Sequence, residues 1–92
     1  MNRRISIDRN VSPEALATLG VKQWPIWSKE VSEFSWHYDE EETCYLLEGD
    51  VEVTPDGGDA VRFGKGDLVV FPQGMSCTWK IHSAVRKHYR FG

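Results

Sequence analysis

Short runs of alternating apolar and polar residues make up most of the chain after Val21. Runs with this period, rich in valine, isoleucine and aromatic residues, are typical of β-strands that bury one face. The pattern predicts strands at residues 5–7, 26–31, 33–38, 43–48, 51–54, 60–63, 68–71, 77–81 and 86–91. Glycine-containing segments between them predict turns at 48–50, 55–59, 64–67 and 72–74.

One segment before these strands carries a helix signal. Ser12 can cap a helix, Pro13 suits its first position and Gly20 can end it. We therefore expect one helix of about two turns near the N-terminus and no second helix. Many short strands joined by tight turns favour an antiparallel sandwich or barrel over a parallel α/β fold.

Length and composition restrict the class of protein. The 92 residues are enough for one compact domain but too few for two, so we expect a single domain over residues 1–92. Four tryptophans and 40% hydrophobic residues supply a core without disulfides or a structural metal. The net charge of −3, with no basic stripe, argues against a nucleic-acid partner.

Location and assembly can also be predicted. The basic N-terminal residues are not followed by an apolar run of signal-peptide or membrane-spanning length, so we expect a cytoplasmic protein without a membrane partner. In that compartment Cys44 and Cys77 should be free thiols. A small barrel leaves edge strands uncovered, and residues 21–31, with Trp24, Ile26 and Trp27, offer an apolar patch for a homodimer.

Two motifs lie in the middle of the chain. Residues 42–49 contain a glutamate, six residues and a glycine, and residues 66–74 contain a glycine, five residues and then Pro-x-Gly. In this order, with one hairpin between them, they resemble the two cupin motifs. The tryptophan-rich flanks are similar to the small single-domain, RmlC-like cupins grouped with the ureidoglycine aminohydrolase-type domain, many of which have no assigned reaction. The resemblance implies an all-β double-stranded β-helix, or jelly-roll barrel, with a pocket and one short N-terminal helix.

The resemblance also indicates where a metal site would lie. Metal-binding cupins take two histidines and a glutamate from the first motif and a third histidine from the second, a set suited to a divalent transition metal. Here Glu42 matches the glutamate, but Cys77 stands at the third histidine position. The site predicted from the resemblance therefore lacks most of its histidines.

The first histidine pair falls on Ser35 and His37 or on Trp36 and Tyr38, depending on the spacing of the family motif. Residues two apart share one face of a strand. The aromatic face, which includes Phe34, gains most by pointing into the barrel. We therefore expect Trp36 and Tyr38 at the histidine positions and His37 in solvent.

By the same alternation Glu42 and Cys44 share one face, as do Cys77 and Trp79, and the motifs turn both faces inward. The predicted pocket is thus aromatic, with one carboxylate and one or two thiols. The candidate ligand-binding residues are Trp36, Tyr38, Cys77 and Trp79.

Two interpretations of the polar groups remain open. Glu42, Cys44 and Cys77 together offer one oxygen and two sulfur ligands for zinc or a similar divalent ion. Alternatively, the cysteines are small buried hydrophobic residues and Glu42 hydrogen-bonds to Tyr38 or to an indole N–H, with no metal. A functional metal site usually shows at least three good ligands, so the second interpretation is favoured and the cofactor stays undetermined.

The last predicted strand is amphipathic. Alternation places Arg86, His88 and Arg90 on one face and Lys87 and Tyr89 on the other. We assign its basic face to solvent or to a subunit contact rather than to a ligand.

Two functions follow. The first is an enzyme acting on a polar, nitrogen-containing metabolite, in which Glu42, set among aromatic rings, is a candidate acid/base group. The ureidoglycine-type resemblance is its only chemical indication. The second is a non-catalytic binding or assembly module with a degenerate, metal-free pocket. Both have a small-molecule pocket, and the sequence identifies no substrate.

Overall fold

The computed structural model describes residues 4–92, which form a 7-stranded sheet, one α-helix and one turn of 3-10 helix. In chain order the elements are β1 (Ser6–Asp8), α1 (Pro13–Leu19), η1 (Val21–Gln23), β2 (Ile26–Lys29), β3 (Ser32–His37), β4 (Glu42–Pro55), β5 (Val61–Gly64), β6 (Leu68–Phe71) and β7 (Ser76–Phe91).

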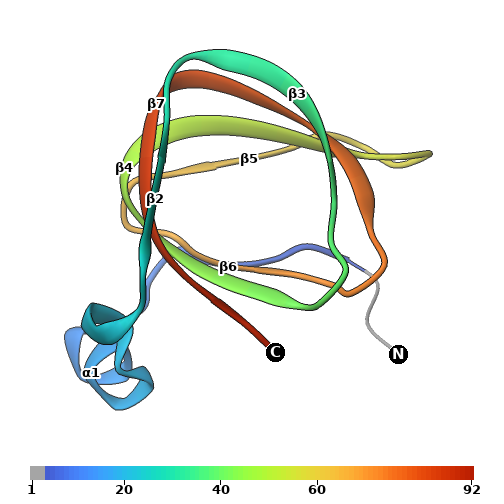
Figure 1. The fold of residues 1–92 in the computed structure, drawn as a ribbon. Helices are drawn as coiled ribbons and strands as arrows, with labels where there is room; N and C mark the ends of the chain where they lie inside the picture. The colour runs from blue at the N-terminus through green and yellow to red at the C-terminus, as the bar shows by residue number, and fades with distance from the viewer. Residues whose placement is uncertain (1–3) are drawn as a thin grey trace.

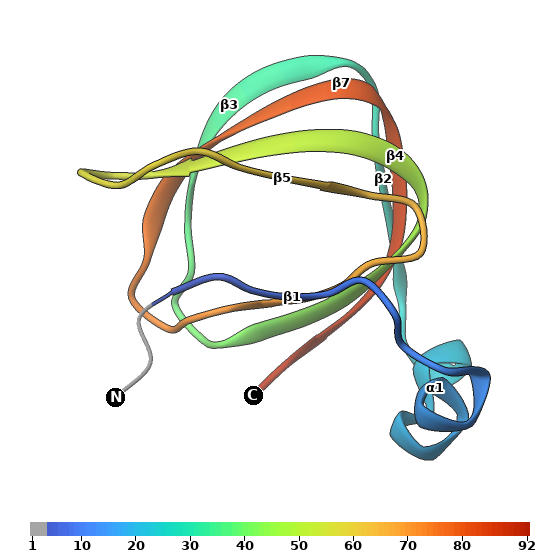
Figure 2. The same cartoon turned by 180° about the vertical axis from the view of Figure 1, so that it is seen from behind.

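The strands are antiparallel and close around a central core. Their main order is β1, β6, β4, β7, β2, with β3 added on β7 and β5 added on β4. β4 and β7 pair along most of their length and curve from one wall of the barrel into the other (Figure 1). Figure 2 shows β3, β4, β5 and β7 crossing one side, β1 crossing the opposite side, and α1 outside the barrel. The predicted all-β jelly-roll barrel with one short helix is confirmed.

β4 and β7 are longer than the alternation predicted. The turn expected at residues 48–50 is wrong, because Gly49 lies inside β4, and β7 runs without a break through the gap expected at residues 82–85. The pairing of β4 with β7 shifts register around Gly49, which has φ 129°. An irregularity of this kind bends a strand instead of reversing it. Gly49 therefore marks a bend between the two walls.

The N-terminal helix follows its predicted signals. The Ser12 side chain accepts a hydrogen bond from the Ala15 N–H at 3.1 Å, and Gly20 ends the helix with φ 71°. One turn of 3-10 helix follows at Val21–Gln23, in a segment where no further helix was expected. This turn buries Val21 and brings Trp24 against Arg90, whose guanidinium lies 4.7 Å from the indole ring. The apolar patch expected over residues 21–31 is therefore smaller than predicted.

The core lies between the two walls and follows the predicted alternation. On β3 and just beyond it, Phe34 packs on the core and Tyr38 is buried, while His37 is exposed and bonds to Ser76 Oγ at 2.7 Å. Cys77 and Trp79 on β7 are buried. Both cysteines are free, as expected. Within residues 4–92 no helix is long and apolar enough to cross a membrane.

Candidate functional site

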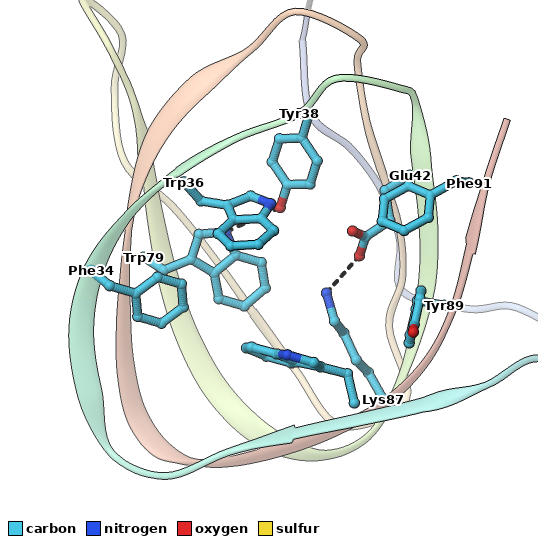
Figure 3. Close-up of a pocket in the computed structure, with 9 residues that line it drawn as sticks. Phe34, Trp36, Tyr38, Glu42, Trp79, Lys87, Tyr89 and Phe91 are labelled. Atoms are coloured by element: carbon cyan, nitrogen blue, oxygen red, sulfur yellow. Dashed lines mark hydrogen bonds and ion pairs between the residues drawn. The ribbon is translucent and has the colours of Figure 1, made fainter.

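A cavity of about 210 Å³ lies within the barrel. Side chains of β2, β3, β4 and β7, and of Tyr38 just after β3, line it (Figure 3). Its walls are aromatic except for one carboxylate and one ammonium group. The lining residues are Trp27, Phe34, Trp36, Tyr38, Glu42, Trp79, Lys87, Tyr89 and Phe91.

The carboxylate and the ammonium group form an ion pair inside this cavity. Lys87 Nζ donates a hydrogen bond to Glu42 Oε2 at 2.6 Å, and each residue is 4% exposed. Glu42 begins β4, and Lys87 lies near the end of β7, which pairs with β4. In Figure 3 the two side chains meet end to end across the cavity. The barrel thus holds two opposite charges out of water.

Aromatic rings surround the Lys87 ammonium. Nζ lies 4.8 Å from the ring centroid of Trp79, 4.9 Å from Trp27 and 5.9 Å from Phe71. A cation held over desolvated rings gains about 2 kcal/mol or more from the π electrons. These rings and Glu42 together replace the water that the charged side chain loses.

A second buried hydrogen bond fixes the aromatic wall. The Trp79 indole Nε1–H donates to the Tyr38 hydroxyl at 3.1 Å. Burial, and then the negative charge of Glu42, raise the pKa of Tyr38 well above its usual range. The Tyr38 ring also stacks on Phe71, with centroids 4.7 Å apart. Tyr38 is therefore a neutral, rigid part of the wall.

Both thiols beside the site are neutral as well. Burial raises the pKa of Cys44 to about 12 and the pKa of Cys77 to about 11. Because the thiolate is the form that binds metals and attacks electrophiles, neither cysteine is poised for that chemistry.

Residues 16–89 match the family model of the EutQ-like cupin domain. The chain belongs to this cupin family. The predicted membership among the small cupins is thus confirmed. No curated protein matches this cupin.

Solved structures agree with this assignment. A DUF861 family protein from Thermotoga maritima is 53% identical, with a TM-score of 0.93 over 97% of this cupin and 100% of that chain. EutQ from Clostridium difficile is 21% identical, with a TM-score of 0.65 over 72% of this cupin and 52% of that chain. A putative ethanolamine utilization protein Q from Salmonella typhimurium is 19% identical, with a TM-score of 0.66 over 95% of this cupin and 68% of that chain. The last two are similar in fold alone.

The side chains of this cupin do not fit the metal site of the metal-binding cupins. Among residues 4–92 no group of three His, Cys, Asp or Glu side chains could hold a metal ion, so the site predicted from Glu42, Cys44 and Cys77 does not form. The Lys87 ammonium occupies one of the two Glu42 oxygens and places a positive charge beside it. In the described part of the chain the side-chain hydrogen bond to Glu42 comes from Lys87, not from Tyr38 or an indole as the alternative expected, and the Trp79 indole donates to the Tyr38 hydroxyl.

Three of the four predicted ligand-binding residues line the cavity. They are Trp36, Tyr38 and Trp79. Cys77 is buried but is not among the lining residues. Trp36 is 47% exposed, so it borders the mouth of the cavity and is not enclosed.

Lys87 is the charged site residue that the sequence pattern did not assign to the cavity, and the aromatic residues Trp27, Tyr89 and Phe91 were not assigned to it either. Alternation placed Lys87 on the same face as Tyr89, but that face was not recognised as the interior. The buried series Cys77, Trp79, Ile81 continues at Val85 and reaches Lys87 without a change of parity. The signal was present, and the break expected at residues 82–85 concealed it.

Proposed function

We propose that this cupin binds a small, polar, nitrogen-containing molecule in the cavity, with Glu42 as the acid/base group. The observation that supports this is the buried Glu42–Lys87 pair within an aromatic cavity. Apolar residues of similar volume often stabilise a protein as much as a buried ion pair does, or more. The contribution of this pair to stability is therefore a weak explanation for its presence. Its place beside a cavity suits ligand recognition.

The pair offers complementary contacts to one class of ligand. The ammonium of Lys87 has three N–H donors, and the Glu42 carboxylate has several acceptor sites, of which only some are used between them. An amide or urea group presents a carbonyl oxygen for Lys87 and an N–H for Glu42 side by side. The surrounding rings can stack on a planar body. The cavity volume of about 210 Å³ is smaller than the roughly 300–1,000 Å³ of sites that bind drug-sized ligands, so the cavity suits a small molecule.

The same geometry supports a proton transfer. Glu42 can accept a proton from a bound N–H while Lys87 stabilises negative charge on the adjacent carbonyl oxygen. Lys87 thereby supplies the positive charge that a metal ion supplies in metal-dependent sites. The reaction class that fits is proton transfer on an amide-like or urea-like substrate.

Titration with benzamide and phenylurea tests the proposal, with toluene as the apolar control. Binding is followed by tryptophan fluorescence, since Trp27, Trp36 and Trp79 line the cavity, and by thermal shift. We expect both amide probes to bind and Lys87→Met to weaken them by about 10-fold or more. Lys80→Met, which changes an exposed lysine, is the matched control. Equal binding of toluene and benzamide, or unchanged binding in Lys87→Met, contradicts the proposal.

One observation favours the non-catalytic module as a second candidate. Among residues 4–92 no buried side-chain nitrogen or oxygen lacks a hydrogen-bond partner, so the pair is satisfied without a ligand. Incubating the protein with phenylurea and assaying ammonia separates the two. Ammonia release that Glu42→Gln abolishes supports the enzyme, whereas bound and unchanged phenylurea supports the module.

Self-association stays a prediction. Trp24 is buried and Trp27 lines the cavity, so the exposed large apolar residues of this segment are Ile26, at 46%, and Val31, at 62%. Ile26 lies on β2, at an edge of the sheet. Size-exclusion chromatography of the wild type and of Ile26→Lys tests for a dimer through this edge.

A further inference from the structure

Lys87 combines three features that together suit covalent chemistry. Its amine lies in the cavity, its charge has an adjacent carboxylate partner, and its surroundings are aromatic rings. We infer that Lys87 captures small aldehydes or ketones in the cavity as an imine, with Glu42 as its proton acceptor. The inference rests on the proposed function in requiring that small molecules enter the cavity.

Position distinguishes Lys87 from the other lysines. Lys22, Lys65 and Lys80 are exposed, Lys29 is half-buried, and Lys87 is the buried lysine of the described chain. An amine in water is almost fully protonated at neutral pH and must lose its proton before it can attack. Lysines that form Schiff bases are commonly desolvated in apolar pockets. Lys87 is desolvated in this way, but Glu42 and the rings stabilise its charged form, so its proton must pass to Glu42 before it can attack.

Glu42 provides the route for the proton. The Nζ–Oε2 distance of 2.6 Å is that of a short, charge-assisted hydrogen bond along which a proton can move to the carboxylate. The resulting amine keeps its place beside Trp27 and Trp79, whose rings limit water. Its lone pair first accepts a hydrogen bond from the protonated Glu42, and it attacks a carbonyl carbon when that contact opens. Deprotonation and positioning therefore come from one contact.

The step balances without a further reactant. Lys87 gives one proton to Glu42, and its lone pair forms a C–N bond while the C=O π electrons move to oxygen. The oxygen takes a proton from the new ammonium centre, and the carbinolamine then loses its hydroxyl as water with the proton returned by Glu42. The products are one water and a protonated imine, which remains paired with the Glu42 carboxylate.

Reductive trapping at neutral pH tests the inference on the intact protein. Benzaldehyde is the probe, cyanoborohydride reduces any protonated imine to a stable secondary amine, and peptide mass spectrometry measures each lysine. We expect Lys87 to be labelled at least about 10-fold faster than Lys80. Glu42→Gln should slow labelling of Lys87 on the order of 100-fold, because the variant lacks the acid that returns the proton when the carbinolamine loses water. Lys80→Met should leave labelling of Lys87 unchanged.

Folding is controlled within the same experiment. In urea, where the cavity is lost, Lys87 and Lys80 should be labelled at equal rates in every variant. If Lys80 is labelled as fast as Lys87 in the folded protein, or if Glu42→Gln is labelled at Lys87 as fast as the wild type, the inference is overturned.

The benzamide titration separates this result from the proposed function. Benzamide binding without labelling of Lys87 overturns imine formation and leaves the amide site standing. Labelling of Lys87 without benzamide binding supports the inference and removes the amide proposal. If benzamide does not bind and Lys87 is not labelled, the amide proposal and the imine inference are both overturned.

Discussion

Glu42 and Lys87 lie 45 positions apart in the chain, yet their charged atoms meet at 2.6 Å inside the barrel. The contact depends on the long pairing of β4 with β7, which brings the start of one strand beside the end of the other. Each charge is buried only because the other is present. Changing one partner therefore has a different consequence from changing both.

Lys87→Met leaves the Glu42 carboxylate buried without its partner. Removal of one member of a buried pair costs about 3–5 kcal/mol, and we expect the free energy of unfolding to fall by that amount. The double variant Glu42→Gln/Lys87→Met removes both charges and should recover most of the loss. Urea unfolding of the four proteins in this cycle measures the coupling. Single and double variants of equal stability would refute a coupled pair.

The sequence was sufficient for the fold and for three of the aromatic residues that line the cavity. Alternation identifies the inward faces of residues 33–38 and 77–81, and the two motifs identify the barrel to which they belong. The inward faces and the barrel were both inferred from the spacing of residues close together in the chain, and this spacing is kept within each strand. Trp36, Tyr38 and Trp79 could therefore be assigned to the site in advance.

The ion pair could not be predicted, because it depends on long-range register. A lysine in an amphipathic strand is normally solvent-exposed, and local spacing alone does not reveal the opposing carboxylate. The partner of Lys87 is fixed by the bend at Gly49 and by the continuity of β7 through residues 82–85. The sequence pattern predicted a turn at Gly49 and a break between strands at residues 82–85.

Gly49→Ala tests this bend. At φ 129° an L side chain is strained, and a Cβ at residue 49 would lie 2.9 Å from Val85 Cγ2 and 3.1 Å from Val85 Cα. Gly57 also has a positive φ, of 74°, but a Cβ there meets nothing within 4 Å. We expect Gly57→Ala to cost about 1–3 kcal/mol from backbone strain alone. Gly49→Ala should cost about 1–3 kcal/mol more, because it also overpacks the strand.

Urea unfolding of the two glycine variants makes the comparison. Equal losses of unfolding free energy would show that the approach of Gly49 to Val85 is not tight.

Tyr38→Phe removes the acceptor of the Trp79 indole N–H. A buried donor left without a partner costs about 1–3 kcal/mol, and we expect a loss of unfolding free energy in this range. The indole N–H resonance of Trp79 should also shift in a proton–nitrogen NMR spectrum. Tyr89→Phe, which removes a hydroxyl from the same cavity without touching this bond, is the control. A variant that leaves both quantities unchanged would argue against the bond.

The buried thiols predict a loss of stability in alkali. Their ordinary pKa is 9.0, whereas burial raises the pKa of Cys44 to about 12 and the pKa of Cys77 to about 11 in the folded protein. Above pH 9 the unfolded chain therefore binds fewer protons than the folded protein, and the free energy of unfolding falls as the pH rises. The stabilising contribution of these groups is complete below pH 9 and is lost on the way to pH 12.

Cys44→Ala isolates the larger contribution. A difference of three pH units corresponds to about 4 kcal/mol, so the wild type should lose about that much more than the variant between pH 9 and pH 12. The variant starts from a lower stability at pH 7, because it leaves a small cavity, but its pH profile should be flatter. Urea unfolding under reducing conditions at several pH values measures both profiles. Parallel profiles would show that the Cys44 thiol ionises in the folded protein as readily as in the unfolded chain.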